Sequence, residues 1–238
     1  LRAWFKRFSN KVKSSNRGIS TMIIKNATFI TSAASPSQFI KPDKPIIAVV
    51  GKSNVGKSSF INMLANQKKL AKTSDTPGRT RLVNYFDFGE FVLADLPGYG
   101  YAKVSKAEKE KWGVTMQKFF ADKSNANYVF SLVDIRHKPT ADDVTMVNFL
   151  HSCAFSFSFI ATKADKLSRM QVKKNVEDIA RFFAVTKQNV IAVSSETRQG
   201  KDEVLAKLDE ILENVALYGP GGGRDEDDEE DEEAENAE

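Results

Sequence analysis

Short apolar runs alternate along the chain with longer segments whose apolar residues recur at helical spacing. Continuous apolar runs bounded by turn residues predict buried strands. The expected strands are residues 46–50, 83–88, 91–95, 128–134, 155–161 and 190–193. Only Gly89 and Glu90 separate the second run from the third, which predicts an antiparallel hairpin.

Four amphipathic helices are expected after the hairpin. They begin near Ser105, Thr140, Ser168 and Gly200, and the sequence from Ser105 to Glu108 is a capping box. The inward-facing apolar residues, which we assign to the core, are Trp112, Met116, Phe119, Phe120, Val144, Val147, Val172, Val176, Ile179, Phe183, Val204, Leu205, Leu208, Ile211, Leu212 and Val215. This alternation predicts an α/β fold of three layers, with a mostly parallel six-stranded sheet, one antiparallel hairpin strand, and helices on both faces.

The charge is segregated along the chain, which changes the meaning of its net charge of +4. Residues 224–238 contain eleven of the 31 acids and one of the 35 bases, so residues 1–223 hold 34 bases and 20 acids, a balance of +14. A body this basic favours a polyanionic partner, for which RNA is the obvious candidate. Ordinary solvated lysines are the alternative.

Both ends of the chain differ in composition from residues 22–218, which we expect to form one domain. Residues 1–21 carry six bases and no acid. Three interpretations stay open for them: a transit peptide, an arm that contacts membrane or RNA, or sequence upstream of a start at Met22, which we favour. Residues 219–238 are expected to be a Gly-rich linker and a disordered acidic tail. The tail either improves solubility or folds back on the basic body as a polyanion mimic.

The scarcity of certain residues narrows the class of protein. The single cysteine, Cys153, cannot form an internal disulfide and fits a reducing compartment. With two histidines and one cysteine, a dedicated zinc site is not expected. No apolar run has the length needed to cross a bilayer. We therefore expect a cytoplasmic protein without stable membrane association, and nothing in the sequence demands more than a monomer.

The first candidate site is a Gly-rich loop between the strand at residues 46–50 and a helical segment. Its sequence, G-K-S-N-V-G-K-S, consists of Gly51, Lys52, Ser53, Asn54, Val55, Gly56, Lys57 and Ser58. In this context G-x-x-x-x-G-K-[ST] binds phosphates, because the glycines let consecutive backbone N–H groups point at an anion beside a helix N-terminus. Lys57 would reach the outer phosphates, and the Ser58 hydroxyl would ligate Mg²⁺. The loop predicts a nucleoside-triphosphate site.

A second motif follows the hairpin and is formed by Asp95, Leu96, Pro97 and Gly98. Asp95 ends an apolar strand, so its carboxylate would lie beside the phosphate loop and hold Mg²⁺ through water. The backbone N–H of Gly98 would meet a γ-phosphate. The motif D-x-x-G is weak alone, but its position after a phosphate loop makes it a strong indication.

A third motif would select the base and is formed by Thr162, Lys163, Ala164 and Asp165. Asp165 can accept hydrogen bonds from both N1–H and the exocyclic amine of guanine, and the stem of Lys163 would lie along the base. Backbone N–H groups for guanine O6 could come from Val193, Ser194 and Ser195. The four residues alone are a common tetrapeptide. In this order they favour GTP and GDP as ligands over the adenine nucleotide of an ATPase or metabolic phosphotransferase.

In this order the motifs resemble the translation-factor-like P-loop GTPases. Longer strings are similar to the bacterial EngB family of GTP-binding proteins, also called YihA or YsxC. These strings are residues 51–59, T-P-G-R-T at 76–80, D-L-P-G-Y-G-Y-A-K-V at 95–104, D-I-R-H at 134–137, T-K-A-D-K at 162–166 and S-S-E-T at 194–197. The resemblance runs from about Met22 to Tyr218, which would make residues 22–218 a G domain with the P-loop GTPase fold. It does not reach the basic leader or the acidic tail.

The resemblance also implies a switch segment that orders and releases with nucleotide state. Its residues are Gly78, Arg79, Thr80, Arg81 and Leu82. The hydroxyl of Thr80 would join Ser58 and Asp95 around Mg²⁺, and the candidate catalytic residues are Lys57, Thr80 and Asn54. A plain turn between helix and strand, which Pro77 and Gly78 would serve equally well, is the alternative.

Hydrolysis of GTP to GDP and phosphate is expected to be slow, because Tyr99-Gly100-Tyr101 stands where a water-positioning glutamine would be. Relatives that lack this glutamine often bind K⁺ through an Asn at the place of Asn54, which alternatively only stabilises the loop. The resemblance implies a switch in large ribosomal subunit assembly, with that subunit or its rRNA as partner, and a requirement for normal cell division and septation. A membrane- or division-associated GTPase that does not act on ribosomes is the alternative.

Overall fold

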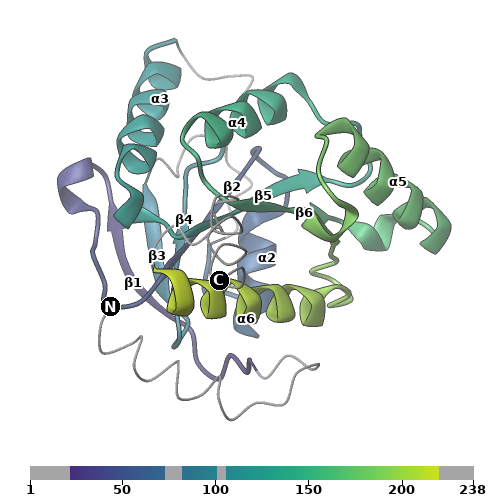
Figure 1. Ribbon diagram of the computed structural model, residues 1–238, viewed down its shortest axis with the longest axis horizontal. Helices are drawn as coiled ribbons and strands as arrows, with labels where there is room; N and C mark the ends of the chain where they lie inside the picture. The colour runs from purple at the N-terminus through teal and green to yellow at the C-terminus, as the bar shows by residue number, and fades with distance from the viewer. Residues whose placement is uncertain (1–21, 73–81, 101–105, 220–238) are drawn as a thin grey trace, which may run out of the picture.

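The computed structural model describes residues 22–72, 82–100 and 106–219, in which seven strands form one sheet in the order β1-β3-β4-β2-β5-β6-β7 (Figure 1). The strands are β1 (Thr28–Ala33), β2 (Ile46–Gly51), β3 (Val83–Asp87), β4 (Val92–Asp95), β5 (Tyr128–Asp134), β6 (Phe157–Thr162) and β7 (Val190–Ala192). Every neighbouring pair from β4 to β7 is parallel, and β3 is antiparallel to both β1 and β4. The predicted mostly parallel sheet with one antiparallel hairpin strand is confirmed.

The prediction of six strands is wrong, because β1 adds a seventh at the edge of the sheet. Its residues do not alternate between buried and exposed: Phe29 and Ile30 are both exposed. A bulge interrupts its register against β3 between Phe29 and Thr31, which shifts the side chains relative to the pleat. An edge strand that is open on one side and bulged does not show the period-2 pattern by which strands are recognised.

Five helices of the described chain lie in two layers, with α2 and α6 on one face of the sheet and α3, α4 and α5 on the other (Figure 1). They are α2 (Lys57–Ala65), α3 (Lys106–Ala121), α4 (Ala141–Ser152), α5 (Arg169–Phe182) and α6 (Lys201–Tyr218), and short 3₁₀ turns occupy Pro36–Gln38, Lys123–Asn125, Ala164–Lys166 and Lys187–Asn189. Ile47 and Val49 of β2 pack toward α2 and α6, whereas Ile46, Ala48 and Val50 pack toward α3 and α4. This central strand is therefore buried on both faces, as its unbroken apolar sequence indicates.

The predicted helix starts at Thr140, Ser168 and Gly200 are confirmed. Thr140 and Ser168 are the N-caps of α4 and α5, and both form capping boxes. Gly200 caps α6 with a φ of 78°, and a Cβ there would come within 2.1 Å of the Ala192 carbonyl oxygen. Only glycine fits that contact. The predicted capping box at Ser105 lies outside the described residues.

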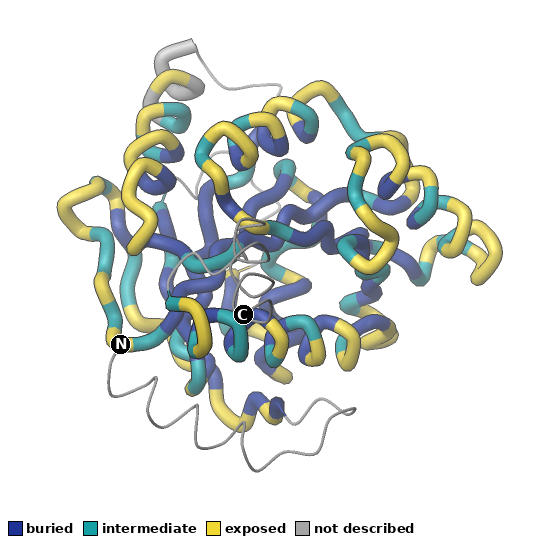
Figure 2. Tube along the Cα trace, in the orientation of Figure 1, coloured by how far each residue is buried: buried dark blue, intermediate teal, exposed yellow. Residues whose placement is uncertain are grey.

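Burial follows this layered arrangement (Figure 2). The predicted inward residues of α6 are all buried, as are Met116, Phe119 and Phe120 of α3. Val144 of α4 is only half-buried. No helix in the described part of the chain is both long and apolar enough to span a membrane.

Candidate nucleotide site

The predicted phosphate loop lies between the end of β2 and the first residue of α2. A Cβ on Gly51 would lie 2.9 Å from a Val55 methyl group and 3.0 Å from Leu132 Cβ, so the turn has no room for a side chain. Gly56 has a φ of 106°, which favours glycine. Among the described residues, no side chain caps the first turn of α2. The N-terminal N–H groups of α2 can therefore serve an anion.

The loop that follows β4 is hydrogen-bonded to the phosphate loop. The Ser53 backbone N–H donates to the Tyr99 carbonyl oxygen at 2.8 Å, and the Tyr99 N–H donates to the Gly51 carbonyl oxygen at 3.3 Å. The Ser53 hydroxyl donates to the same Tyr99 oxygen at 3.0 Å. This pairing places Leu96, Pro97 and Gly98 beside the phosphate loop, where the sequence predicts them.

Lys57 and Asp95 form an ion pair across this junction. The two side chains are 12% and 4% exposed, so the pair is largely shielded from water. A nucleotide in the loop would compete with Asp95 for Lys57, because the lysine of a phosphate loop contacts the outer phosphates. The ion pair joins the residues proposed to handle phosphate and Mg²⁺.

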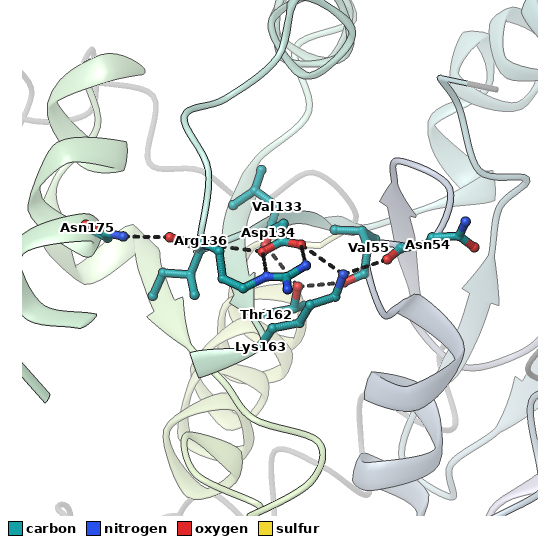
Figure 3. Close-up of polar contacts among 9 residues, drawn as sticks. Asn54, Val55, Val133, Asp134, Arg136, Thr162, Lys163 and Asn175 are labelled. Carbon is teal, nitrogen blue, oxygen red and sulfur yellow. Dashed lines mark hydrogen bonds and ion pairs between the residues drawn. The ribbon is translucent and has the colours of Figure 1, made fainter. Parts of the chain in front are cut away.

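The predicted guanine motif is tied to the phosphate loop by side-chain hydrogen bonds (Figure 3). The Lys163 Nζ donates to the Asn54 carbonyl oxygen at 2.8 Å, and the buried Thr162 hydroxyl donates to the Val55 carbonyl oxygen at 2.6 Å. Lys163 itself has a φ of 65°, which directs the chain sharply away from β6. Two motifs that are far apart in the sequence are thus held at a fixed distance.

Asp165 is directed toward the segment that follows β7. The Ser194 hydroxyl donates to Asp165 Oδ1 at 2.8 Å, and Lys166 Nζ lies 2.8 Å from Oδ2. The contact with Lys166, with that from Ser194, lowers the pKa of the Asp165 carboxyl below its ordinary value. The carboxylate is therefore ionised at neutral pH, as acceptance of two guanine N–H groups requires.

The proposed use of backbone N–H groups after β7 needs correction. The Val193 N–H already donates to the Ala161 carbonyl oxygen at 2.8 Å, and the Ser194 N–H donates to the Gln199 carbonyl oxygen at 3.0 Å. Both groups are used to hold the loop itself. Of the three residues, only Ser195 has a backbone N–H without a partner among the described residues. Ser195 is therefore the remaining candidate donor to guanine O6.

Sequence reasoning missed Asp134 as a member of this site. Its carboxylate accepts hydrogen bonds from Lys163 Nζ at 2.8 Å and from Arg136 Nε and Nη2 at 2.9 and 2.8 Å (Figure 3). Burial would raise the pKa of Asp134, but the hydrogen bonds from Arg136 and Lys163 outweigh it and lower that pKa well below its ordinary value. The signal was present, since Asp134 ends an apolar strand as Asp95 does.

A second missed residue is Asp143, in the first turn of α4. It is buried, accepts a hydrogen bond from the Tyr99 hydroxyl at 2.9 Å, and accepts two more from Thr140. Burial raises the pKa of Tyr99 above its ordinary value, so the phenol stays protonated and remains a donor. Tyr99 is consequently directed into the core rather than toward the phosphates.

Most of the predicted switch segment lies outside the described residues. Gly78, Arg79, Thr80 and Arg81 lie outside the described residues, and Leu82 is half-buried just before β3. Asn54 has a φ of 63°. Asn tolerates this left-handed conformation better than most residues, which gives it a role in the loop independent of any ion.

The side-chain oxygens near the phosphate loop fit Mg²⁺ shared with phosphate and water better than they fit a metal ion held by protein ligands alone. Among the described residues, no three His, Cys, Asp or Glu side chains cluster so as to hold a metal ion. Mg²⁺ usually takes one or two protein oxygens together with water and phosphate. Ser58 follows Lys57 at the start of α2, and Asp95 at the end of β4 is paired with Lys57, so both residues offer side-chain oxygens as ligands.

Fold and site define the class as a P-loop GTPase. Residues 46–163 match the family of 50S ribosome-binding GTPases. The probable GTP-binding protein EngB of Clostridium kluyveri is 46% identical over 81% of this chain and 98% of its own. That of Clostridium acetobutylicum is 48% identical over 79% and 94%. A crystal structure of a probable GTP-binding protein EngB shares the fold, with a TM-score of 0.60 and 22% identity over 71% of this chain and 98% of that one.

The chain belongs to the EngB family of GTP-binding proteins, and its activity is that of a GTPase.

Proposed function

We propose that this protein is a GTP-dependent switch that acts on the large ribosomal subunit during its assembly. The observation that carries its nucleotide dependence is the pair of bonds from Lys163 and Thr162 to the phosphate loop, which fix a guanine motif and a phosphate motif as one site. The ribosomal partner is supported by the matched family, described as 50S ribosome-binding GTPases, and by the basic balance of residues 1–223.

In the proposed mechanism the chain positions GTP and neutralises its charge. The backbone N–H groups of the phosphate loop and Lys57 would hold the β- and γ-phosphates, and Asp165 would hold guanine. The oxygens of Ser58, Thr80 and Asp95 would hold Mg²⁺, which when bound neutralises charge on the phosphate oxygens. Ordering of residues 78–82 by the γ-phosphate would distinguish the GTP state from the GDP state.

Slow intrinsic hydrolysis is part of the proposal, because the residue after Gly98 cannot orient water. The Tyr99 hydroxyl is bonded to Asp143 inside the fold. Asn54 is the candidate K⁺ ligand, and K⁺ would then supply the charge that an arginine finger supplies elsewhere. Equal GTP turnover in potassium and sodium buffers would remove this role and leave Asn54 its conformational one.

A slow switch of this kind suits a cytoplasmic, monomeric assembly factor whose loss also impairs cell division and septation. The test is sedimentation of the purified chain with large ribosomal subunits, with a non-hydrolysable GTP analogue or with GDP, at one fixed ionic strength. Co-migration only in the GTP-like state is the expected result. Absence from the subunit in both states would contradict the proposal and favour a membrane- or division-associated GTPase.

A further inference from the structure

Two acid-free basic segments lie side by side next to the guanine motif. They are residues 135–140, between β5 and α4, and residues 166–174, which run into α5; together we call them the basic strip. These fifteen residues contain six Lys or Arg and no Asp or Glu. The Asn175 side chain donates to the Ile135 carbonyl oxygen at 2.8 Å and holds α5 against the first segment (Figure 3).

Four of the six cations are available to a partner. Lys138, Arg169, Lys173 and Lys174 are exposed, and none of them forms an ion pair with another residue that the structure describes. Elsewhere on the surface many lysines are paired, for example Lys187 with Glu177. Lys173 is close to Glu177, one turn further along α5, but it forms no ion pair with it, and a cluster with this excess of exposed cations attracts a polyanion.

The remaining two cations connect the strip to the nucleotide site. Arg136 is bonded to Asp134, which also holds Lys163, and Lys166 is bonded to Asp165. A pocket of about 200 Å³ lies between the strip and the phosphate loop, and its lining includes Asn54, Asp134 and Lys138. A partner seated on the strip would therefore touch the residues that hold guanine.

We propose that the basic strip is the surface through which this protein binds the phosphate backbone of RNA. The assignment of that RNA to the large ribosomal subunit rests on the proposed function. The chemistry of the strip favours RNA over a membrane, because Met170, 81% exposed, is its one large exposed apolar residue. The apolar side of α5 packs against the sheet, and Phe182, which is also exposed, is the last residue of that helix and lies outside the strip, so the strip offers no apolar face to insert into lipid.

The test compares two double charge reversals of equal size. Lys138→Glu with Lys174→Glu alters one residue of each segment, whereas Lys68→Glu with Lys69→Glu alters two exposed lysines that follow α2 on the opposite face of the sheet. Binding to purified large subunits and to bare rRNA is measured over a range of salt concentrations. Unchanged GDP affinity and melting temperature show that each variant is folded.

The strip variant is expected to bind RNA about tenfold more weakly at near-physiological salt, and its log–log salt slope should fall by about two, one for each lost phosphate contact. The control should bind as the unaltered chain does. Equal binding by the strip variant and the unaltered chain would overturn the proposal, as would equal loss in the control.

The outcomes for the strip and for the proposed function can be told apart. If the unaltered chain binds large subunits and the strip variant binds them equally well, the strip is wrong and the function stands. If the chain binds bare rRNA through the strip but never binds the large subunit, the RNA-binding role of the strip is supported and the proposed function on the large subunit is contradicted. Strip-dependent binding to anionic vesicles, without binding to rRNA, would replace RNA by a membrane and overturn the proposal.

Discussion

Asp95 and the phosphates of a bound nucleotide would compete for the same cation, Lys57. The carboxylate of Asp95 neutralises Lys57 in a site that is largely closed to water. When phosphates take Lys57, Asp95 loses its partner and faces their negative charge at close range. Mg²⁺ between the two would relieve this repulsion, so the cost of separating the pair should appear mainly when Mg²⁺ is withheld.

Replacement of Asp95 by Asn should therefore strengthen GDP binding in the absence of Mg²⁺. A hydrogen bond to a charged group contributes about 1.5–3 kcal/mol, and a neutral acceptor retains roughly half of that. The state without nucleotide should lose about 0.75–1.5 kcal/mol, which is about a fourfold to twelvefold gain in Mg²⁺-free affinity. With Mg²⁺ present the order should reverse, because the variant lacks the carboxylate that holds the ion through water.

The assay is a titration with a fluorescent GDP analogue, in EDTA and again in excess Mg²⁺. Asp87→Asn is the matched control, because Asp87 also pairs with a lysine, Lys44, but lies at the far end of β3. It should change neither affinity. If Asp95→Asn binds GDP in EDTA no more tightly than the unaltered chain, the ion pair does not compete with the nucleotide and the reasoning is wrong.

Three further changes test other parts of the structure. Tyr99→Phe leaves Asp143 without one of its buried donors and should lower the free energy of unfolding in urea by about 1–3 kcal/mol, and an unchanged midpoint would contradict that bond. Asp134→Asn should weaken GDP binding about tenfold by releasing Lys163. The pKa of the Asp134 carboxyl lies below its ordinary value, so the carboxylate stabilises the fold above about pH 4. The difference in the free energy of unfolding between the unaltered chain and the variant should therefore shrink as the pH falls below about 4. Gly200→Ala should lower the free energy of unfolding by more than about 2 kcal/mol, because residue 200 has a left-handed backbone conformation and the new Cβ would clash with the Ala192 carbonyl oxygen. A melting temperature equal to that of the unaltered chain would refute this.

The parts of the fold that could be predicted share one property, which is that local sequence suffices to specify them. The unbroken apolar run of β2, the Gly89 turn and the caps at Thr140 and Ser168 each act within a few residues. The edge strand β1 could not be found this way, because its bulge and open side remove the alternation. Its place depends on β3, which lies more than fifty residues further along the chain.

The same distinction applies to the site. The three motifs were predicted from order and spacing, and the structure brings the phosphate loop together with both later motifs. The role of Asp134 depends on Lys163, 29 residues away, and that of Asp143 on Tyr99, 44 residues away. Such pairs are decided by tertiary contact. The use of the Ser194 N–H within its own loop could not be foreseen for the same reason.

The hydrogen bonds from Lys163 and Thr162 to the phosphate loop join the part of the site proposed to bind guanine to the part proposed to bind the phosphates. Because these hydrogen bonds join the two halves of the site, binding of one end of GDP presents the other end at high effective concentration. Guanosine alone or pyrophosphate alone gains nothing from this arrangement. The covalent link between base and phosphate thus contributes to recognition in addition to the groups it joins.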